Sequence, residues 1–260
     1  MAIRVAVVGA TGRMGTLVSR LISESAEFEL AAAISSKDEL SEMARADVVV
    51  DVSVPAVSRD VVEFAVDNGL KVLVGTSGWT GERVAAIAAK VDEKPGAAVV
   101  IVPNFSLGSV LATRFAATAA RFFDSIEIVE AHSASKIDSP SGTAIRTAEL
   151  MATAREDGGH GLVASPHVDQ RARGQQIAGI PVHSIRMQGV VAKLDVYFGG
   201  LGEVLTLSHE TLSQTAYEAG IMLALRALPS ARGVTVGLDA LLGLDEAAAG
   251  ADGSEAPGSR

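Results

Sequence analysis

The sequence predicts an α/β protein with a Rossmann-like doubly wound parallel sheet, joined to a second α+β domain with a mixed or antiparallel sheet. Three observations predict this fold class. Apolar β-branched runs alternate with amphipathic stretches in the first hundred residues, a glycine-rich turn follows the first run, and three strand patterns crowd together late in the chain.

Continuous apolar character is typical of parallel strands that are buried on both faces. The strands expected in the first hundred residues are Ile3–Val8, Leu30–Ile34, Asp47–Ser53, Lys71–Gly75 and Ala97–Val102. The helices expected between them are Met14–Ser23, Ala56–Val66 and Glu82–Val91. Asn68-Gly69 then ends the second helix as helix C-termini commonly end.

The pattern changes after Pro103–Ser106, which is interpreted as a joint. A long helix to about Phe122 is expected next, and a polar surface loop is expected over Glu156–Gly179. The strands expected in this part are Ser125–Ala131, Ile180–Gln188, Val191–Phe198 and Glu203–His209, with Gly199-Gly200 between the last two. A loop and then a helix from Ser141 follow the first of them, and a last helix is expected over Leu212–Leu228. The elements after it could return to the first domain.

Composition excludes several classes of protein. The 260 residues are 48% hydrophobic and 20% charged, with a net charge of -9, which argues against a nucleic-acid surface. The absence of cysteine excludes disulfides and thiolate chemistry. No apolar run reaches the roughly 18 residues of a membrane span and no signal peptide is recognised, so a cytoplasmic protein is expected. The acidic, Ala- and Gly-rich stretch 245–260 is predicted to be a disordered tail.

A glycine turn follows the first strand and has the spacing G-x-x-G-x-x-G. Its residues are Gly9, Ala10, Thr11, Gly12, Arg13, Met14 and Gly15. Such glycines permit a tight turn, close approach of a pyrophosphate and close packing of helix on strand. The position of the turn between a strand and a helix predicts a nicotinamide dinucleotide site, although some glycine turns are only turns.

The end of the second strand bears on the choice of cofactor. An NAD site usually carries Asp or Glu there, whereas this strand ends in Ser35, Ser36 and Lys37 with no carboxylate. Two hydroxyls and an ammonium, with Arg13 as a second cation, suit a 2′-phosphate. The sequence therefore predicts NADPH as the preferred cofactor with NADH possible; alternatively, Lys37 is solvated and Asp38 or Glu39 contacts the ribose.

Two further strand ends are candidates for lining the nicotinamide pocket, because ligands of such sheets bind at the carboxyl ends of strands. Their residues are Gly75, Thr76 and Ser77 after the fourth strand, and Val102, Pro103, Asn104 and Phe105 after the fifth. A plain turn and a hinge are the alternative interpretations.

The stretch Glu130–Ala144, EAHSASKIDSPSGTA, combines a proton donor with an anion cradle. His132 and Lys136 precede Ser141, Gly142 and Thr143, which open a helix whose first amide groups favour a carboxylate. With the glycine turn, the stretch suggests reduction of a small carboxylated substrate by a nicotinamide cofactor.

Each of these side chains also has an ordinary structural interpretation. His132 could be a hydrogen-bonded strand-end residue, Lys136 a solvated lysine and Ser141 a helix N-cap. His183 and Arg186 are interpreted as sheet or interface residues. The remaining histidines, His160, His167 and His209, show no metal-ligand spacing, and no metal is expected.

The segments GATGRMG, VGTSGW, VPNFSLG, EAHSASKIDSPSGTA and GIPVHSIR resemble, in the same order, the 4-hydroxy-tetrahydrodipicolinate reductases, also called dihydrodipicolinate reductases, of bacterial lysine biosynthesis. The resemblance extends to about Leu244. It implies an NAD(P)H-binding domain over 1–106 and 216–244, and a domain over 107–215 for substrate binding and homotetramer formation.

The resemblance also implies roles for single residues. His132 matches the family's acid, Lys136 its partner in proton donation, and Gly142 and Thr143 the backbone cradle for a substrate carboxylate, beside Ser141. Segments 75–77 and 102–105 match cofactor-contacting strands, and hinges are implied near 104–106 and 213–215.

One position departs from the family's pattern. The family usually has two adjacent histidines, the second assigned to a substrate carboxylate, and here Ser133 replaces it. The expectation is a retained reaction with weaker substrate binding. The alternatives are an NADP-dependent reductase of another cyclic imine or unsaturated dicarboxylate, a catalytically silent dinucleotide-binding regulator, and, less favoured, an NAD-dependent hydroxy-acid dehydrogenase.

Overall fold

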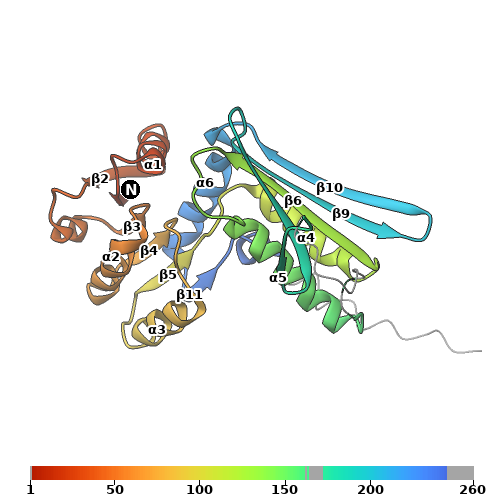
Figure 1. Cartoon of the computed structure of the whole chain (residues 1–260). Helices are drawn as coiled ribbons and strands as arrows, with labels where there is room; N and C mark the ends of the chain where they lie inside the picture. Colours follow the sequence, from red (N-terminus) through yellow and green to blue (C-terminus); the bar gives the residue numbers. More distant parts are fainter. Residues whose placement is uncertain (1, 162, 164–171, 245–260) are drawn as a thin grey trace, which may run out of the picture. The chain divides into compact units, whose positions relative to one another are not determined.

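The structure, a computed structural model, describes residues 2–161, 163 and 172–244, and these form two compact units. Unit 1 comprises the chain up to Phe105 together with the chain from Tyr217 onward, and unit 2 comprises Ser106–Ala216. Figure 1 shows the elements of both units along the chain.

Unit 1 is built on a six-stranded sheet in which every pairing is parallel, in the order β11-β5-β4-β3-β1-β2. The strands are β1 (Ile3–Val8), β2 (Phe28–Ile34), β3 (Val48–Asp51), β4 (Lys71–Val74), β5 (Ala98–Ile101) and β11 (Gly233–Val236). The helices are α1 (Arg13–Ser23), α2 (Pro55–Asp67), α3 (Gly81–Asp92) and α6 (Glu218–Ala227). The predicted doubly wound parallel sheet is confirmed.

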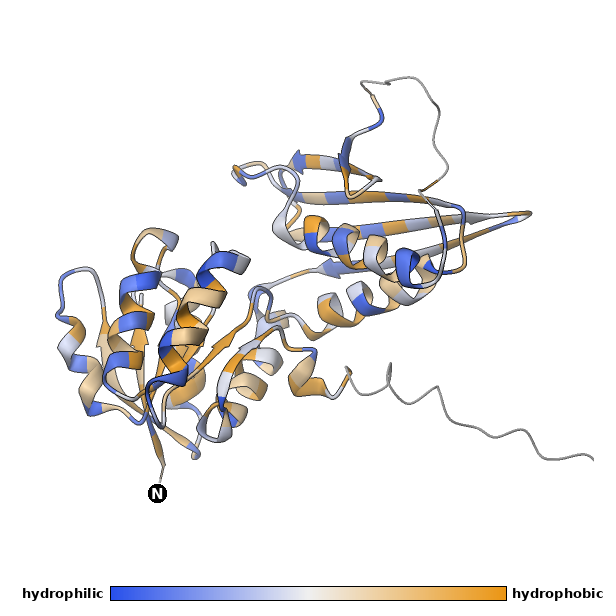
Figure 2. Cartoon of the chain, turned by 90° about the horizontal axis from the view of Figure 1, so that it is seen from below, coloured by the Kyte–Doolittle hydropathy of each residue, from blue (hydrophilic) through white to orange (hydrophobic). Residues whose placement is uncertain are grey.

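The core of unit 1 explains why these strands read as continuous apolar runs. Residues of the central strands, such as Val7, Val49 and Val99, are fully buried, and the strands of this unit are largely orange in Figure 2. α2 and α3 pack against one set of alternating strand residues, whereas α1 and α6 pack against each other. Helices thus take up the apolar side chains that a parallel sheet exposes on both faces.

Unit 2 has a five-stranded mixed sheet in the order β10-β9-β6-β8-β7, in which only β6 and β8 are parallel. The strands are β6 (Ser125–Ser133), β7 (Gln175–Ile177), β8 (Ile180–Met187), β9 (Ala192–Gly200) and β10 (Glu203–Thr211). α4 (Leu107–Ala120) and α5 (Gly142–Asp157) lie side by side on one face of the sheet (Figure 1). The predicted second α+β domain with a mixed sheet is confirmed.

Side chains of the unit 2 strands alternate between two environments, visible as alternating colours in Figure 2. Ile128, Val196 and Phe198 are buried under the helices. On the other face Tyr197 and Val204 are exposed. A sheet covered by helices on one face only accounts for this period of two.

Several element boundaries differ from the sequence prediction. β6 runs two residues further than predicted because it stays paired with β8 and β9, so His132 lies on a strand and not in a loop. α6 begins at Glu218 because β10 stays paired to Thr211 and a 3-10 helix occupies Gln214–Tyr217.

Smaller differences concern turns and short elements. Gly199 and Gly200 end β9, and Gly202, at φ +80°, lies in the turn instead. β7 lies within the stretch predicted as a loop, whose middle part is outside the described residues. A 3-10 helix at Leu40–Arg45 was not predicted. The predicted disordered tail lies outside the described residues.

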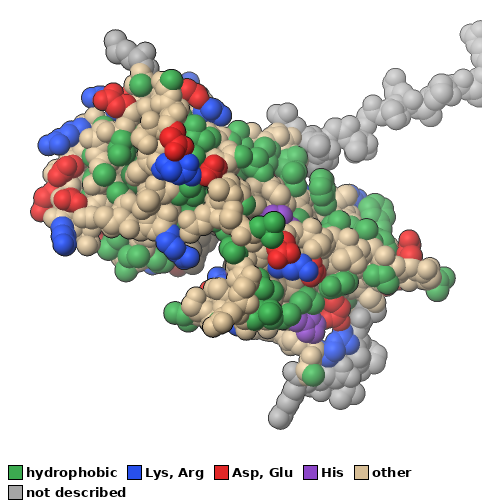
Figure 3. Space-filling model, turned by 90° about the horizontal axis from the view of Figure 1, so that it is seen from above, with side chains coloured by type: hydrophobic (Ala, Val, Ile, Leu, Met, Phe, Trp, Pro, Cys, Tyr) green, Lys and Arg blue, Asp and Glu red, His purple; other side chains and the backbone are tan. Residues whose placement is uncertain are grey.

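The surface carries charges of both signs. Figure 3 shows acidic and basic side chains interspersed on the visible face. Among the described residues, no helix is both long enough and apolar enough to cross a membrane.

Candidate active site

The glycine turn lies where the strand order of unit 1 reverses, at β1 between β2 and β3. Gly9 has φ +84°, and a Cβ there would lie 2.6 Å from the carbonyl oxygen of Val52 in the loop after β3. A Cβ on Gly15 would lie 2.1 Å from the Gly9 carbonyl oxygen. Both positions therefore require glycine. The two glycines allow the turn, α1 and the loop after β3 to pack closely at the switch point, where such sheets bind ligands.

The N-terminus of α1 fits an anion. Gly12 is the N-cap and supplies no side-chain hydrogen bond, and the first turn, which begins at Arg13, holds no acidic residue. Thr11, Gly12 and Arg13 are exposed, whereas Ala10 and Met14 are half-buried. The positive end of a helix that no side chain caps matches the pyrophosphate of a dinucleotide.

A buried carboxylate that the sequence analysis did not single out organises the neighbouring strand ends. Asp51, at the end of β3, accepts hydrogen bonds from the Ser53 hydroxyl at 2.5 Å and from the Ser58 hydroxyl. The Ser58 hydroxyl also accepts from Trp79 Nε1 at 3.0 Å, and the Thr76 hydroxyl donates to the Asp51 carbonyl at 3.4 Å. Burial raises the pKa of Asp51, and the hydroxyl donors oppose that rise.

The two segments expected near the nicotinamide adjoin each other. A Cβ on Gly75 would lie 2.6 Å from Cε2 of Phe105, which is buried, and Val102 N donates to the Val74 carbonyl at 2.8 Å. Thr76 is buried. Ser77 and Pro103 are exposed and Asn104 is half-buried.

The loop after β2 bears on the choice of cofactor. The Asp38 carboxylate, which the sequence analysis named as an alternative ribose contact, lies against Ser35. It accepts from Ser35 N at 2.8 Å and from the Ser35 hydroxyl at 2.6 Å, and these hydrogen bonds lower the pKa of Asp38. The reason is local: an Asp side chain commonly accepts hydrogen bonds from nearby backbone in a turn.

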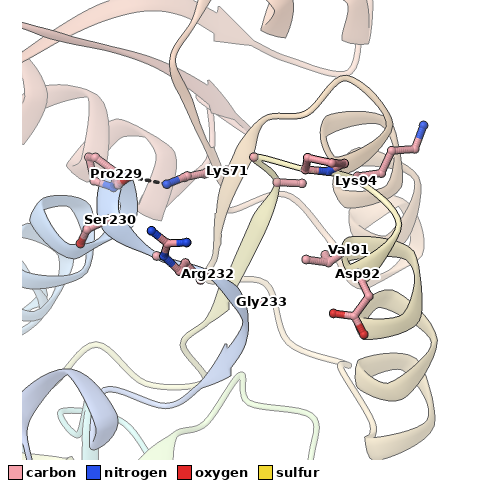
Figure 4. Close-up of a pocket in the computed structure, with 12 residues that line it drawn as sticks. Lys71, Val91, Asp92, Lys94, Pro229, Ser230, Arg232 and Gly233 are labelled. Atoms are coloured by element: carbon pink, nitrogen blue, oxygen red, sulfur yellow. Dashed lines mark hydrogen bonds between the residues drawn. The ribbon is translucent and has the colours of Figure 1, made fainter.

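Unit 1 has a cavity at the end of its sheet opposite to the glycine turn. It has a volume of about 480 Å³ and is lined by the residues that begin β4 and β11, Lys71 and Gly233, together with the end of α3. Figure 4 shows the Lys71 ammonium directed at the Pro229 carbonyl, with Lys94 and Asp92 pointing outward. A cavity at the amino ends of the strands is not the dinucleotide site of a doubly wound fold.

In unit 2, His132 and Lys136 come together because a turn ends β6. Lys136 N donates to the Ser133 carbonyl at 3.0 Å, which folds the chain back. The Lys136 ammonium pairs with Asp138 at 2.7 Å, and the Ser133 hydroxyl is 3.2 Å from that of Ser135. The predicted catalytic pair thus shares one strand end, where the Lys136 charge acts on His132.

Glu130 lies beneath His132 and is fully buried. His132 Nδ1 is 2.5 Å from Glu130 Oε2. The Arg186 guanidinium of β8 donates to both carboxylate oxygens of Glu130, at 2.8 and 2.9 Å, and Ser141 N donates to Oε1 at 3.2 Å. Burial would raise the pKa of Glu130, but hydrogen bonds from Arg186, Ser184 and His132 outweigh it and the pKa is lowered.

His132 itself has a lowered pKa in this state. Burial lowers its pKa from the ordinary 6.5, and the charges of Lys136 and Arg186 act in the same direction against the opposing pull of Glu130. A bound dicarboxylate would add negative charge and raise the pKa of His132 towards the working range of a general acid.

The N-terminus of α5 lies beside this pair. Ser141 is its N-cap and its hydroxyl accepts from Ala144 N at 3.3 Å. Gly142 is exposed, and a Cβ there would meet no atom within 4 Å, while Thr143 is half-buried. The first turn holds no acid, so the positive end of the helix fits a carboxylate.

Sequence reasoning missed Asp51, Glu130 and the partner role of Arg186. Only Glu130 carried a signal, since it lies two residues before His132 and alternation places both side chains on one face of a strand. His183 was interpreted as a sheet residue, and it contacts Glu127 at 2.6 Å.

Fold and site together define an oxidoreductase built on a dinucleotide-binding fold. Family models described as dihydrodipicolinate reductase, N-terminus and C-terminus, match residues 3–105 and 108–242. The chain belongs to the dihydrodipicolinate reductase family, which confirms the resemblance drawn from its motifs.

Named relatives agree with this membership. The chain is 66% identical to a 4-hydroxy-tetrahydrodipicolinate reductase of Clavibacter michiganensis subsp. michiganensis over 260 residues, covering 99% of this chain and 93% of the relative. The enzyme of the same name from Mycolicibacterium smegmatis is 42% identical, with 93% and 99% covered. A dipicolinate-bound dihydrodipicolinate reductase from Paenisporosarcina sp. TG-14 has a TM-score of 0.76 at 27% identity, with 92% and 99% covered.

Proposed function

We propose that this chain reduces 4-hydroxy-tetrahydrodipicolinate to tetrahydrodipicolinate in the diaminopimelate and lysine pathway, with NAD(P)H as reductant. The observation that carries the proposal is the pairing of His132 with a buried carboxylate beside Lys136 and the α5 N-terminus, in a chain 66% identical to a reductase of that name. These groups offer one proton and two sites of positive potential to a small dicarboxylate.

The chain's own residues have separate tasks in this reaction. The amides at Gly142 and Thr143, with Ser141, hold one carboxylate, and Lys136 leaves Asp138 to meet the substrate's negative charge. Bound NAD(P)H supplies the hydride. His132, protonated at Nε2, then donates the proton that the reduced substrate requires, with Lys136 as its partner.

Unit 1 is the proposed dinucleotide site. The turn 9–15 holds the pyrophosphate, and the segments 75–77 and 102–105 line the nicotinamide. Ser35, Ser36, Lys37 and Arg13 favour a 2′-phosphate, so NADPH is the proposed preference. Asp38, against Ser35, limits that preference and leaves NADH as a usable cofactor.

The proposed assembly is a homotetramer formed by unit 2, and the proposed location is the cytoplasm, where reduced nicotinamide nucleotides are regenerated. The helix-free face of the unit 2 sheet supports the assembly, because Ile185, Met187, Tyr197 and Val204 are exposed on it. An apolar sheet face of this kind is typical of a protein interface.

A coupled assay tests the reaction. A synthase condenses pyruvate with aspartate semialdehyde, and this protein is added with NADPH or, separately, with NADH. Loss of nicotinamide absorbance that requires both enzymes is expected. His132→Gln should lower kcat by about 10²- to 10⁴-fold while dipicolinate binding and the melting temperature are retained.

Two other outcomes separate the alternatives. Folded, NADPH-binding protein that oxidises no cofactor in this assay points to a different cyclic imine or unsaturated dicarboxylate, and to Ser133 as the reason. An unchanged His132→Gln variant contradicts His132 as the acid.

A further inference from the structure

We propose that Glu130 and Arg186 are positioning residues that fix the tautomer of His132, keeping the ring proton on Nδ1 and reserving Nε2 for the substrate. The proposal rests on the reaction proposed above and adds the residues that orient its proposed acid, His132. It gives a role to two side chains outside the proposed catalytic pair of His132 and Lys136.

The contacts of Glu130 link several elements. Glu130 is fully buried, and its oxygens accept hydrogen bonds from His132 Nδ1, both terminal nitrogens of Arg186, the amide of Ser141 and the Ser184 side chain. Arg186 Nη2 also donates to the Asp138 carbonyl at 2.7 Å, and Nη1 donates to the Ile185 carbonyl at 2.8 Å. The pair therefore joins β6, β8, the turn that carries Lys136, and the start of α5.

The charge state of Glu130 decides the tautomer of His132. A carboxylate that is ionised accepts hydrogen bonds and cannot donate them. His132 Nδ1 must then carry the proton at 2.5 Å from Oε2, whether the ring is neutral or charged. Nε2 is left as the only ring nitrogen that gains or loses a proton, as in the established role of a carboxylate behind a catalytic histidine.

Replacing Glu130 by glutamine reverses this arrangement. At the Oε1 position the new NH₂ group would face two donors, Arg186 Nη2 and Ser141 N. At the Oε2 position it would face one donor, Arg186 Nη1, and the His132 ring, which can become an acceptor by moving its proton to Nε2. The second orientation leaves fewer donors opposed, so E130Q should favour the wrong tautomer.

The charges that face His132 predict the direction of two pH shifts. Glu130 stabilises the imidazolium, whereas Lys136 and Arg186 oppose it. E130Q removes the favourable charge, so the pKa of His132 falls and the alkaline limb of kcat moves to lower pH. Arg186→Gln removes an opposing charge, so the same limb moves to higher pH as long as Glu130 stays ionised. Loss of packing alone would not move the limb in opposite directions.

The test compares pH profiles of kcat for wild type, E130Q and Arg186→Gln. The matched control is Glu127→Gln, since Glu127 lies on the same strand and also pairs with a histidine, His183, at 2.6 Å. E130Q should lose about 10- to 100-fold in kcat at neutral pH, with the opposite limb shifts in the two variants and none in the control.

A second measurement does not depend on turnover. Nitrogen-15 spectra of histidine-labelled protein, with the His132 signals assigned by their loss in His132→Gln, should show the proton on Nδ1 in wild type and on Nε2 in E130Q. An Nε2–H tautomer in wild type would overturn the proposal. So would an unchanged alkaline limb of the kcat pH profile in folded E130Q and Arg186→Gln. Wild-type protein with the expected tautomer but no turnover contradicts the proposed reaction and leaves the positioning role supported.

Discussion

His132 acquires its chemistry from neighbours that are close in space and mostly distant in sequence. Glu130 lies two residues away on the same strand. Arg186, which holds the Glu130 carboxylate in place, is 56 residues from Glu130 in the sequence. A strand position fixes the face of the sheet on which the His132 side chain lies, and the contact with Glu130 holds its ring. A single residue type therefore indicated the proposed acid, and the pairing of β6 with β8 brings Arg186 to the carboxylate beside it.

Asp38 is the residue expected to limit the preference for NADPH. Asp38→Asn should raise the NADPH-to-NADH ratio of kcat/KM by about fivefold, because removing a charge a few ångströms from a phosphate in water is worth about 1 kcal/mol. The amide can still accept from Ser35. Steady-state kinetics with both cofactors measure the ratio.

Glu39→Gln is the control for this prediction, since it is the neighbouring carboxylate and has no hydrogen bond to Ser35 among those described. A shift in Glu39→Gln without one in Asp38→Asn would make Glu39 the ribose contact.

Ser133 is the position at which the chain departs from the family's paired histidines. Ser133→His should lower KM for the dicarboxylate by about two- to fivefold, because a protonated imidazole adds a partly exposed charge worth up to about 1 kcal/mol. KM measured below pH 6.5 should respond more than KM measured above it. An unchanged or raised KM at both pH values would remove Ser133 from the proposed substrate site.

At the scale of elements, a side-chain cap does not by itself separate structural from binding helix ends. α3, α4 and α5 are capped by the hydroxyls of Thr80, Ser106 and Ser141, whereas α1, α2 and α6 begin without a side-chain cap. Ser141 therefore has the capping role that the sequence suggested as an alternative, and this does not exclude a place for a carboxylate at the next amides.

Two glycines of one turn should respond differently to the same substitution. Gly15→Ala should lower the free energy of unfolding by about 1–3 kcal/mol, because its Cβ would lie 2.1 Å from the Gly9 carbonyl. Gly12→Ala has a permitted φ of -76° and a nearest contact of 3.3 Å, so its stability should change by no more than about 0.5 kcal/mol.

Denaturant unfolding and NADPH titration measure the two effects. Gly12→Ala should weaken NADPH binding, since its methyl group would face the proposed pyrophosphate. Equal loss of stability in both variants, or full NADPH affinity in Gly12→Ala, would contradict the assignment of Gly15 to packing and of Gly12 to cofactor binding.

For the whole molecule, the exposed face of the unit 2 sheet carries the proposed assembly. The edge strand β10 presents Val204 with 71% of its surface exposed. Val204→Asp should reduce the mass in solution from four times the 26.6 kDa chain to a smaller species, because a charge would be buried without a partner.

Light scattering after size exclusion measures this mass. Leu212→Asp is the control, because Leu212 is 79% exposed and lies beyond the end of β10. A wild-type monomer would contradict the tetramer, and a Val204→Asp tetramer would place the interface elsewhere.

Much of this protein was predictable from local sequence. Runs such as Ile3–Val8, the glycine turn and the Ser141 cap are short-range patterns, and the parallel sheet, the second mixed sheet and the family followed from them. Local pattern works there because alternation, turn chemistry and capping are properties of neighbouring residues.

Tertiary structure alone decided the rest. The length of β6, and with it the strand position of His132, depends on pairing with β8 and β9, and the return of β11 to β5 joins segments far apart in the chain. The clamp of Arg186 on Glu130 joins two neighbouring strands of one sheet, and no local pattern encodes it. Strand register and buried ion pairs depend on which distant segments meet, because only the folded sheet brings their backbones and charges within hydrogen-bonding distance.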